Sequence, residues 1–211
     1  MTRGVVVVQE ALGVTPWLEG VAARFAAEGY ATAVPHLYRR LGDPVLEHPQ
    51  DFPKAREAMA TLTAESILED VDAAIEATGV PHARVAVVGF CMGGNVALFA
   101  GAMRELGAAV SFYGGGITES RWAGVPPLVE VAPGLRSPWL GLYGLRDTGI
   151  PVEHVDALEA AARLAPVPTR VERYDAGHGF FNDSLPDLHA PAAAGAAWPL
   201  VLSWLRQNLP E

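Results

Sequence analysis

One short segment constrains the fold of this chain more than any other. The residues Gly89-Phe90-Cys91-Met92-Gly93 follow directly after the apolar run Val85-Ala86-Val87-Val88. Glycines placed two residues before and two residues after a polar side chain are typical of a sharp turn between a buried strand and a helix, because the two elements nearly touch there. Such a turn presents the Cys91 thiol at the end of the strand. The alternative is that this lone cysteine is a small buried hydrophobic residue.

Apolar, β-branched runs alternate with amphipathic patterns along the chain, which predicts parallel strands joined by crossover helices. Strands are expected at residues 4–9, 30–35, 84–89, 108–112, 139–143 and 169–174, and helices at 16–28, 66–78, 92–103, 152–164 and 191–209. Pro199 should kink the last helix or mark its true start. Two segments without periodicity, 37–54 and 114–137, should lie at the edge where such sheets bind ligands. We therefore predict a single α/β domain over residues 1–211, with a mostly parallel central sheet flanked by helices on both faces.

Composition narrows the class of protein. A chain of 211 residues can bury a core without disulfides, and its single cysteine cannot form one internally, so a reducing compartment, the cytoplasm, is the simplest expectation. We find neither a secretory leader pattern nor an apolar run of membrane-spanning length. The formal charge is −9, with one lysine and scattered arginines, which argues against nucleic acid as a partner. A monomer or small homo-oligomer is expected.

Two further polar residues follow predicted strands. Asp147 comes after the strand at 139–143, and His178 follows the strand at 169–174 in Ala176-Gly177-His178-Gly179. A thiol needs a base to remove its proton, and the base needs a third group to orient it. The order nucleophile, acid, histidine, each after a strand of a parallel sheet, is that of the α/β-hydrolase fold. His178 could instead make a structural hydrogen bond. Asp147 could be a turn former, with Asp175 and Asp183 as competitors for its role.

Acyl transfer also requires donors for a developing oxyanion. The main-chain N–H of Met92, at the start of the helix after the turn, is one candidate, and that of Ala11, after the first strand, is the second. Glu10 would be a carboxylate at the end of a buried strand, which implies either a structural salt bridge or a role in the site. No histidine or cysteine spacing of a metal site is present, so no metal is predicted.

Several segments together resemble the dienelactone hydrolase family: Gln9-Glu10-Ala11-Leu12-Gly13, Leu37-Tyr38, Gly89-Phe90-Cys91-Met92-Gly93-Gly94, Phe112-Tyr113-Gly114 and Ala176-Gly177-His178-Gly179-Phe180-Phe181-Asn182-Asp183. The resemblance covers nearly the whole chain. It implies a hydrolase of small esters or lactones with a Cys-His-Asp triad, whose roles fall on Cys91, His178 and Asp147, and it implies no cofactor. It also implies that Glu10 gates Cys91, because a nearby carboxylate disfavours the thiolate until an anionic substrate displaces it.

The chain departs from this family where the substrate carboxylate is bound. Family members carry an arginine shortly after the catalytic histidine, whereas Phe180-Phe181-Asn182-Asp183 contains none. Arg39 is one candidate replacement, and Arg40, Arg56 and Arg121 are others. The aromatic residues expected to line the substrate pocket are Tyr38, Tyr113, Trp122, Phe180 and Phe181, although core packing is the commoner fate of such side chains.

The sequence is compatible with three functions. The first is an ester or lactone hydrolase that forms an acyl-enzyme at Cys91 and could also accept thioesters. The second is a catalytically silent relative that binds a small molecule. The third is a redox-responsive thiol protein, which would need an external thiol because no resolving cysteine is present.

Overall fold

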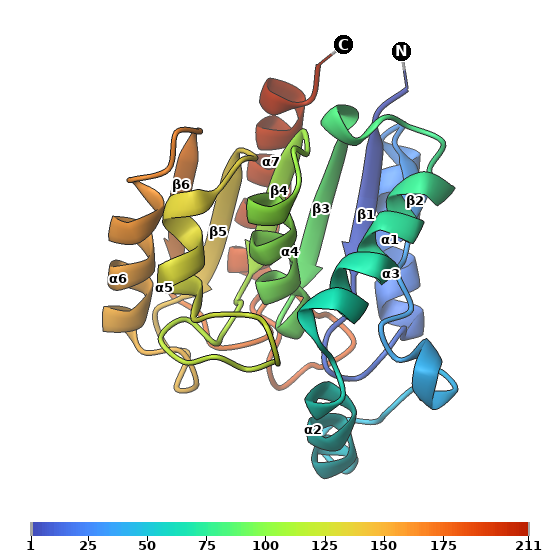
Figure 1. Cartoon of the computed structure of the whole chain (residues 1–211). Coiled ribbons are helices and arrows are strands. Elements are labelled where there is room, and N and C mark those ends of the chain that lie inside the picture. The colour runs from blue at the N-terminus through green and yellow to red at the C-terminus, as the bar shows by residue number, and fades with distance from the viewer. Residues whose placement is uncertain (1, 211) are drawn as a thin grey trace.

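A single parallel sheet organises the molecule. The computed structural model describes residues 2–210, and its six strands lie in the order β2 (Ala31–Ala33), β1 (Gly4–Val8), β3 (Val85–Phe90), β4 (Ala108–Phe112), β5 (Trp139–Gly144) and β6 (Thr169–Tyr174) (Figure 1). Every neighbouring pair is parallel. The predicted α/β fold with a parallel central sheet is confirmed.

The central strands are apolar because both of their faces are covered. Every residue of β1, β3 and β4 is buried, and the valines of β1 are completely inaccessible. Continuous apolar runs of this kind are typical of strands packed between two helical layers. The edge strand β6 is only partly buried, and the other edge strand, β2, has three residues where the sequence predicts six.

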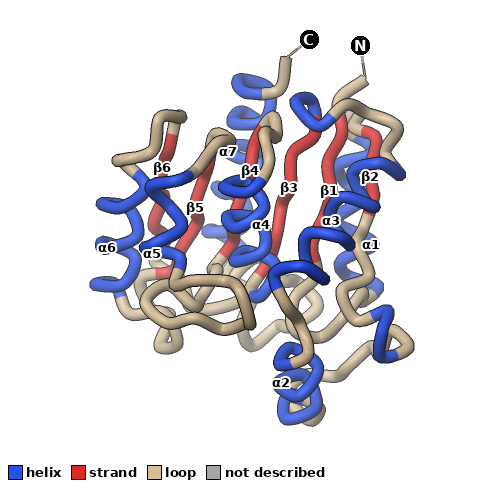
Figure 2. Tube along the Cα trace, viewed as in Figure 1, coloured by secondary structure: helices blue, strands red, loops and turns tan. Residues whose placement is uncertain are grey.

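Two helical layers cover the sheet, as the sequence predicts (Figure 2). One layer holds α1 (Pro16–Ala27) and α7 (Pro191–Asn208), which meet where the rings of Phe25 and Trp198 lie 4.6 Å apart. The other holds α3 (Ala64–Ala77), α4 (Met92–Met103), α5 (Leu128–Val131) and α6 (Val152–Ala162). Short 3-10 turns occur at Arg39–Leu41, His82–Arg84 and Ala132–Gly134.

Helices α2 and α7 also differ from the sequence-based prediction. Helix α2 (Phe52–Ala60) overlaps a segment that the sequence shows as aperiodic, because its buried positions are the small residues Ala55 and Ala58, which leave almost no hydrophobic pattern. Pro199 lies inside α7, which begins at Pro191 and continues past it, so the proline does not mark the start of the helix.

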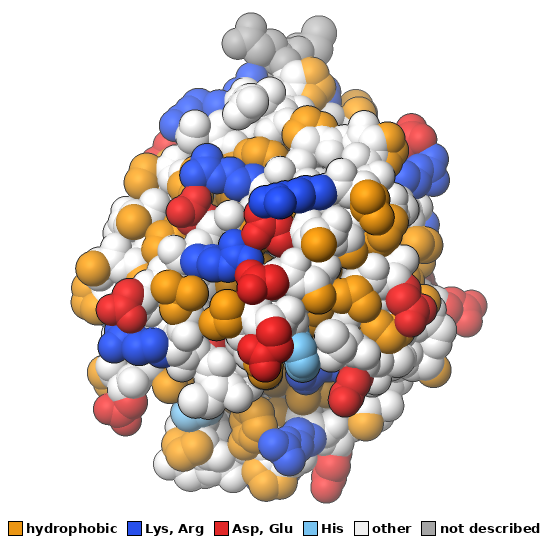
Figure 3. Space-filling model, turned by 90° about the vertical axis from the view of Figure 1, so that its left-hand side faces the viewer, with side chains coloured by type: hydrophobic (Ala, Val, Ile, Leu, Met, Phe, Trp, Pro, Cys, Tyr) orange, Lys and Arg blue, Asp and Glu red, His pale blue; other side chains and the backbone are white. Residues whose placement is uncertain are grey.

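The charged side chains are interspersed rather than segregated on the face beside α6 and β6 (Figure 3). Arg173 there pairs with Asp156 and Glu159 at 2.6 and 2.8 Å, and Arg170 pairs with Glu172 at 2.5 Å. Within residues 2–210 no helix combines the length and the apolar character that a bilayer span requires.

Candidate active site

The turn after β3 has the tight geometry that its glycines predict. A Cβ at Gly89 would stand 1.8 Å from the carbonyl oxygen of Gly93, and a Cβ at Gly93 would stand 2.5 Å from that of Val8. Cys91 itself has φ 52° and ψ −114°, a backbone conformation that a residue with a side chain rarely adopts. Its N–H donates to the Phe112 carbonyl at 3.0 Å, which anchors the turn to β4. The strained conformation holds the sulfur at the carboxyl edge of the sheet.

The loops after β5 and β6 bring Asp147 and His178 together. His178 Nδ1 lies 2.6 Å from Asp147 Oδ2, and the other carboxylate oxygen accepts a hydrogen bond from the Gly149 N–H at 2.8 Å. The Asp147 side chain is 1% exposed, whereas that of His178 is 37% exposed. The carboxylate is therefore fixed in place, and it orients an imidazole that remains open on its other side.

The open side of the imidazole faces Cys91. Burial of His178 opposes its charged form, but the neighbouring Cys91 sulfur, as a charge and a hydrogen-bond partner, and the Asp147 carboxylate together hold the pKa of His178 well above its ordinary value. With Nδ1 engaged by Asp147, Nε2 is the nitrogen left for the sulfur. Neither Asp175 nor Asp183 takes this place. Asp175 is an exposed partner of Arg146 at 2.9 Å.

Glu10 is held by two donors. The Tyr113 hydroxyl donates to Oε1 at 3.3 Å, and the Asn182 amide donates to Oε2 at 2.7 Å. Burial raises the pKa of Glu10, against the effect of Asn182, His178 and Tyr113, which lower it. The structural salt bridge considered for Glu10 is absent from its described contacts, since both partners are neutral. No role is predicted for Asn182 from the sequence, because an amide four residues after a histidine has no distinctive signature.

Ser184 fixes the orientation of the Asn182 amide. Asn182 Oδ1 accepts from the Ser184 N–H at 3.0 Å and from its hydroxyl at 2.6 Å. The NH2 end must therefore point to Glu10. Each oxygen of the Glu10 carboxylate therefore accepts a hydrogen bond, and the carboxylate interacts electrostatically with His178.

A cavity of about 750 Å³ opens at this edge of the sheet, within the range typical of small-molecule sites. Cys91, His178 and Asp147 line it together with Ala11 and Met92, the residues predicted to supply oxyanion donors. The remaining walls come from α2, from residues 115–122, from 148–150, and from Asn95 and His154. Both segments without periodicity thus contribute to the cavity.

The proposed substrate-binding residues divide into two groups. Trp122 lines the cavity, and so do the alternative arginines Arg56 and Arg121. Six other candidates do not line it. Two of them are Phe181, which is buried against the rings of Phe90 and Phe112, and Arg40, which is paired with Glu69 and Asp70. Tyr113 supports Glu10, Tyr38 lies behind Ala11 and Met92, Phe180 is completely buried among aromatic rings, and Arg39 is paired with acidic residues of α3. Core packing prevails for Phe180 because Phe112, Tyr113 and Tyr174 surround it.

Among residues 2–210 there is no group of three or more His, Cys, Asp or Glu side chains able to hold a metal ion.

Comparison with known proteins identifies the family. Residues 1–209 match the model of the "Dienelactone hydrolase family". A protein of Escherichia coli strain K12 named "Putative carboxymethylenebutenolidase" is 36% identical over 96% of this chain and 76% of its own length. The carboxymethylenebutenolidase of Rhodococcus opacus is 29% identical, over 97% of this chain and 81% of its own.

A solved structure agrees with these sequences. The "Putative Dienelactone Hydrolase" of Klebsiella pneumoniae superposes with a TM-score of 0.87 at 31% identity, over 98% of this chain and 87% of that one. The chain therefore belongs to the dienelactone hydrolase family and is an enzyme of the ester- and lactone-hydrolysing class.

Proposed function

We propose that this enzyme cleaves small carboxylic esters or lactones through a covalent intermediate on Cys91. The observation that supports this best is the chain of contacts from Asp147 to His178 to Cys91, three residues that follow three different strands. A nucleophile, a base and a group that orients the base are the minimum that covalent acyl transfer requires.

The proposed reaction has two halves. The Cys91 proton passes to His178 Nε2, and the thiolate attacks the acyl carbon to form a C–S bond while the carbonyl electron pair moves to oxygen. The N–H groups of Ala11 and Met92 stabilise this oxyanion. Its collapse breaks the C–O bond, and the alkoxide takes the proton from His178. Water then gives a proton to His178 and attacks the thioester, which releases the acid and restores the thiol. A thioester substrate would follow the same course.

We further propose that the substrate carries an anionic group, bound by Arg56 and Arg121. Both residues line the cavity, and neither has a carboxylate partner among the described contacts of the chain. Arg56 lies over the Phe52 ring, 5.2 Å from its centroid, which holds it at the cavity wall. The relatives named carboxymethylenebutenolidase suggest a carboxylate-bearing lactone.

The arginine proposal is tested with a matched pair of esters, one neutral and one carrying a carboxylate. Arg56→Gln and Arg121→Gln should each raise KM for the anionic ester about tenfold, the loss of one modest charge-assisted hydrogen bond, with KM for the neutral ester unchanged. Arg136→Gln, which removes an exposed partner of Glu105 outside the cavity, serves as the control. Equal effects on both esters would contradict an anion-binding role.

We also propose that Glu10 gates the thiol in the absence of substrate. Its carboxylate is buried and electrostatically coupled to His178. An anionic substrate that displaces the Glu10 carboxylate must break its hydrogen bonds to Asn182 and Tyr113. Glu10→Gln should therefore speed alkylation of Cys91 by iodoacetamide in the resting enzyme, and equal or slower labelling would argue against the gate.

The central test follows turnover of chromogenic short-chain esters by the wild type, Cys91→Ala and His178→Ala. Loss of turnover in both variants supports the proposal, and retention of turnover by Cys91→Ala would end it. No turnover by the wild type across a varied ester panel would favour a small-molecule-binding relative. A glutathione adduct that forms without ester turnover would favour a redox-responsive thiol.

We expect the protein to act in the cytoplasm, where the thiol stays reduced.

A further inference from the structure

The hydroxyl of Tyr38 connects the two residues proposed to supply oxyanion donors. It donates to the Ala11 carbonyl at 3.1 Å and also contacts the Met92 sulfur at 3.4 Å. Tyr38 is 1% exposed, so these contacts are made behind the cavity wall, out of reach of solvent. Burial, and then the nearby Cys91, raise the pKa of Tyr38, so its hydroxyl stays protonated as a donor. The Tyr38 hydroxyl therefore links Ala11 to Met92 close to Cys91.

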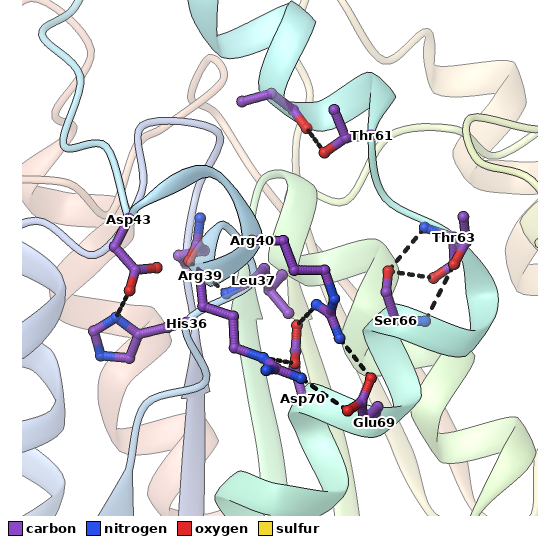
Figure 4. A network of polar contacts seen from close by, with 12 residues as sticks. His36, Leu37, Arg39, Arg40, Asp43, Thr61, Thr63, Ser66, Glu69 and Asp70 are labelled. Atoms are coloured by element: carbon purple, nitrogen blue, oxygen red, sulfur yellow. Dashed lines mark hydrogen bonds and ion pairs between the residues drawn. The ribbon is translucent and has the colours of Figure 1, made fainter.

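The segment that carries Tyr38 is itself anchored from two directions. The N–H of the preceding residue, Leu37, donates to Gln9 Oε1 at 3.3 Å, which ties the segment to the end of β1. On the other side, Arg39 and Arg40 donate to the two oxygens of Asp70 at 2.6 and 2.7 Å (Figure 4). The Asp70 side chain is only 2% exposed, in the middle of α3. An ion pair with a buried carboxylate resists rearrangement far better than an exposed pair.

This arrangement accounts for residues that have no other role in the site. Arg39 and Arg40, two of the candidates for substrate binding, instead attach one segment to α3. Tyr38, a candidate for the pocket wall, contacts the residues behind that wall. A catalytic donor has to be held within a fraction of an ångström of its productive position, and residues behind it usually supply that constraint. The loop at Ala11 is also held by two main-chain hydrogen bonds: the Gly13 N–H donates to the Glu10 carbonyl at 3.3 Å, and the Leu46 N–H donates to the Leu12 carbonyl at 2.9 Å.

We propose that Tyr38 is a positioning residue for the oxyanion site, whose hydroxyl holds the Ala11 loop against the start of α4 at Met92. The inference rests on the proposed acyl-transfer function. Tyr38 touches neither the substrate nor the Cys91 sulfur in this role. It acts through the two main-chain N–H groups that stabilise the transition state.

The test replaces Tyr38 with Phe, which removes the hydroxyl and keeps the ring in the core. We expect kcat for ester hydrolysis to fall about tenfold, less than the hundredfold or more that follows loss of a whole oxyanion donor, with KM nearly unchanged. A small aldehyde inhibitor adds to a thiol as a hemithioacetal, whose oxygen would occupy the oxyanion site. Its affinity for the enzyme should fall by a similar factor. The rate of Cys91 alkylation by iodoacetamide, which forms no oxyanion, should remain that of the wild type.

Tyr30→Phe is the matched control, because Tyr30 is also largely buried but belongs to the segment leading into β2, outside the cavity lining. It should leave kcat and aldehyde affinity unchanged. A general loss of structure in Tyr38→Phe would change alkylation as well, and that result would overturn the positioning role. So would a kcat within twofold of the wild type. Failure of the acyl-enzyme proposal itself is distinguishable, because it would appear as retained turnover in Cys91→Ala.

Discussion

Replacement of Asp147 by Asn tests the orientation of the catalytic histidine with almost no change of shape. The Gly149 N–H can still donate to the retained oxygen, but an amide NH2 group would face His178 Nδ1 in place of the carboxylate that lies 2.6 Å away. The imidazole must then accept a hydrogen bond at Nδ1 and carry its proton on Nε2. This is the wrong tautomer for removal of the Cys91 proton.

The size of the effect follows from the bond that is lost. A charge-assisted hydrogen bond contributes about 1.5 to 3 kcal/mol, and the lower half of that range applies because the His178 side chain is 37% exposed. At 1.36 kcal/mol per factor of ten, the population of imidazolium falls about 10- to 50-fold, and the reversed tautomer adds to this. We expect kcat/KM to fall by about 10² to 10⁴, in line with the effect of reversing a triad histidine.

The assay is initial-rate hydrolysis of a chromogenic ester near neutral pH, with thermal melting to confirm that each variant is folded. Asp175→Asn and Asp183→Asn are the matched controls, because these two carboxylates follow the same strand as His178 and are the other sequence candidates for the role of Asp147. Both should retain wild-type kcat/KM. A value for Asp147→Asn within threefold of the wild type, or an equal loss in a control variant, would refute this reasoning.

Two further predictions concern stability. Gly93→Ala should destabilise the fold by about 3 kcal/mol or more in urea unfolding, because its Cβ would lie 2.5 Å from the Val8 carbonyl oxygen. Gly195→Ala in α7, where no atom lies within 4 Å of the new Cβ, should stabilise the fold by about 0.5 to 1 kcal/mol. Equal effects of the two substitutions would contradict the crowded turn. Burial raises the pKa of Glu10 above its unfolded-state pKa of 4.5. The wild type should therefore lose stability as the pH rises from 4.5 through the folded-state pKa. The Tm advantage of Glu10→Gln should grow over that interval and vanish below it. Parallel Tm curves for the two proteins would contradict the buried carboxylate.

The sequence predicts those parts of the site that are encoded by backbone constraint. Gly89 and Gly93 are required by contacts of 1.8 and 2.5 Å that no side chain could survive, so their spacing alone locates the turn at Cys91. The placement of Asp147 and His178 follows from topology, because parallel strands end at one edge of the sheet. Their mutual contact, at 2.6 Å, is the geometric outcome of that order.

The parts that the sequence does not predict depend on side-chain direction and on small residues. Nothing local distinguishes an arginine that faces the cavity, Arg56, from one that pairs with a buried carboxylate, Arg39, because the partner Asp70 is 31 residues away. Asn182 supports Glu10 across 172 residues of chain. Helix α2 is missed because alanines form its buried face.

The covalent intermediate is the claim on which the account depends, and its direct measurement is the mass of the enzyme during turnover. The reaction with a slowly deacylated ester is quenched in acid within the first turnovers, and the intact protein and its proteolytic peptides are weighed. We predict a mass increase equal to one acyl group, located on the peptide that contains Cys91, and no increase in Cys91→Ala. An acyl group on another residue, or full turnover by Cys91→Ala without an adduct, would contradict the proposed mechanism.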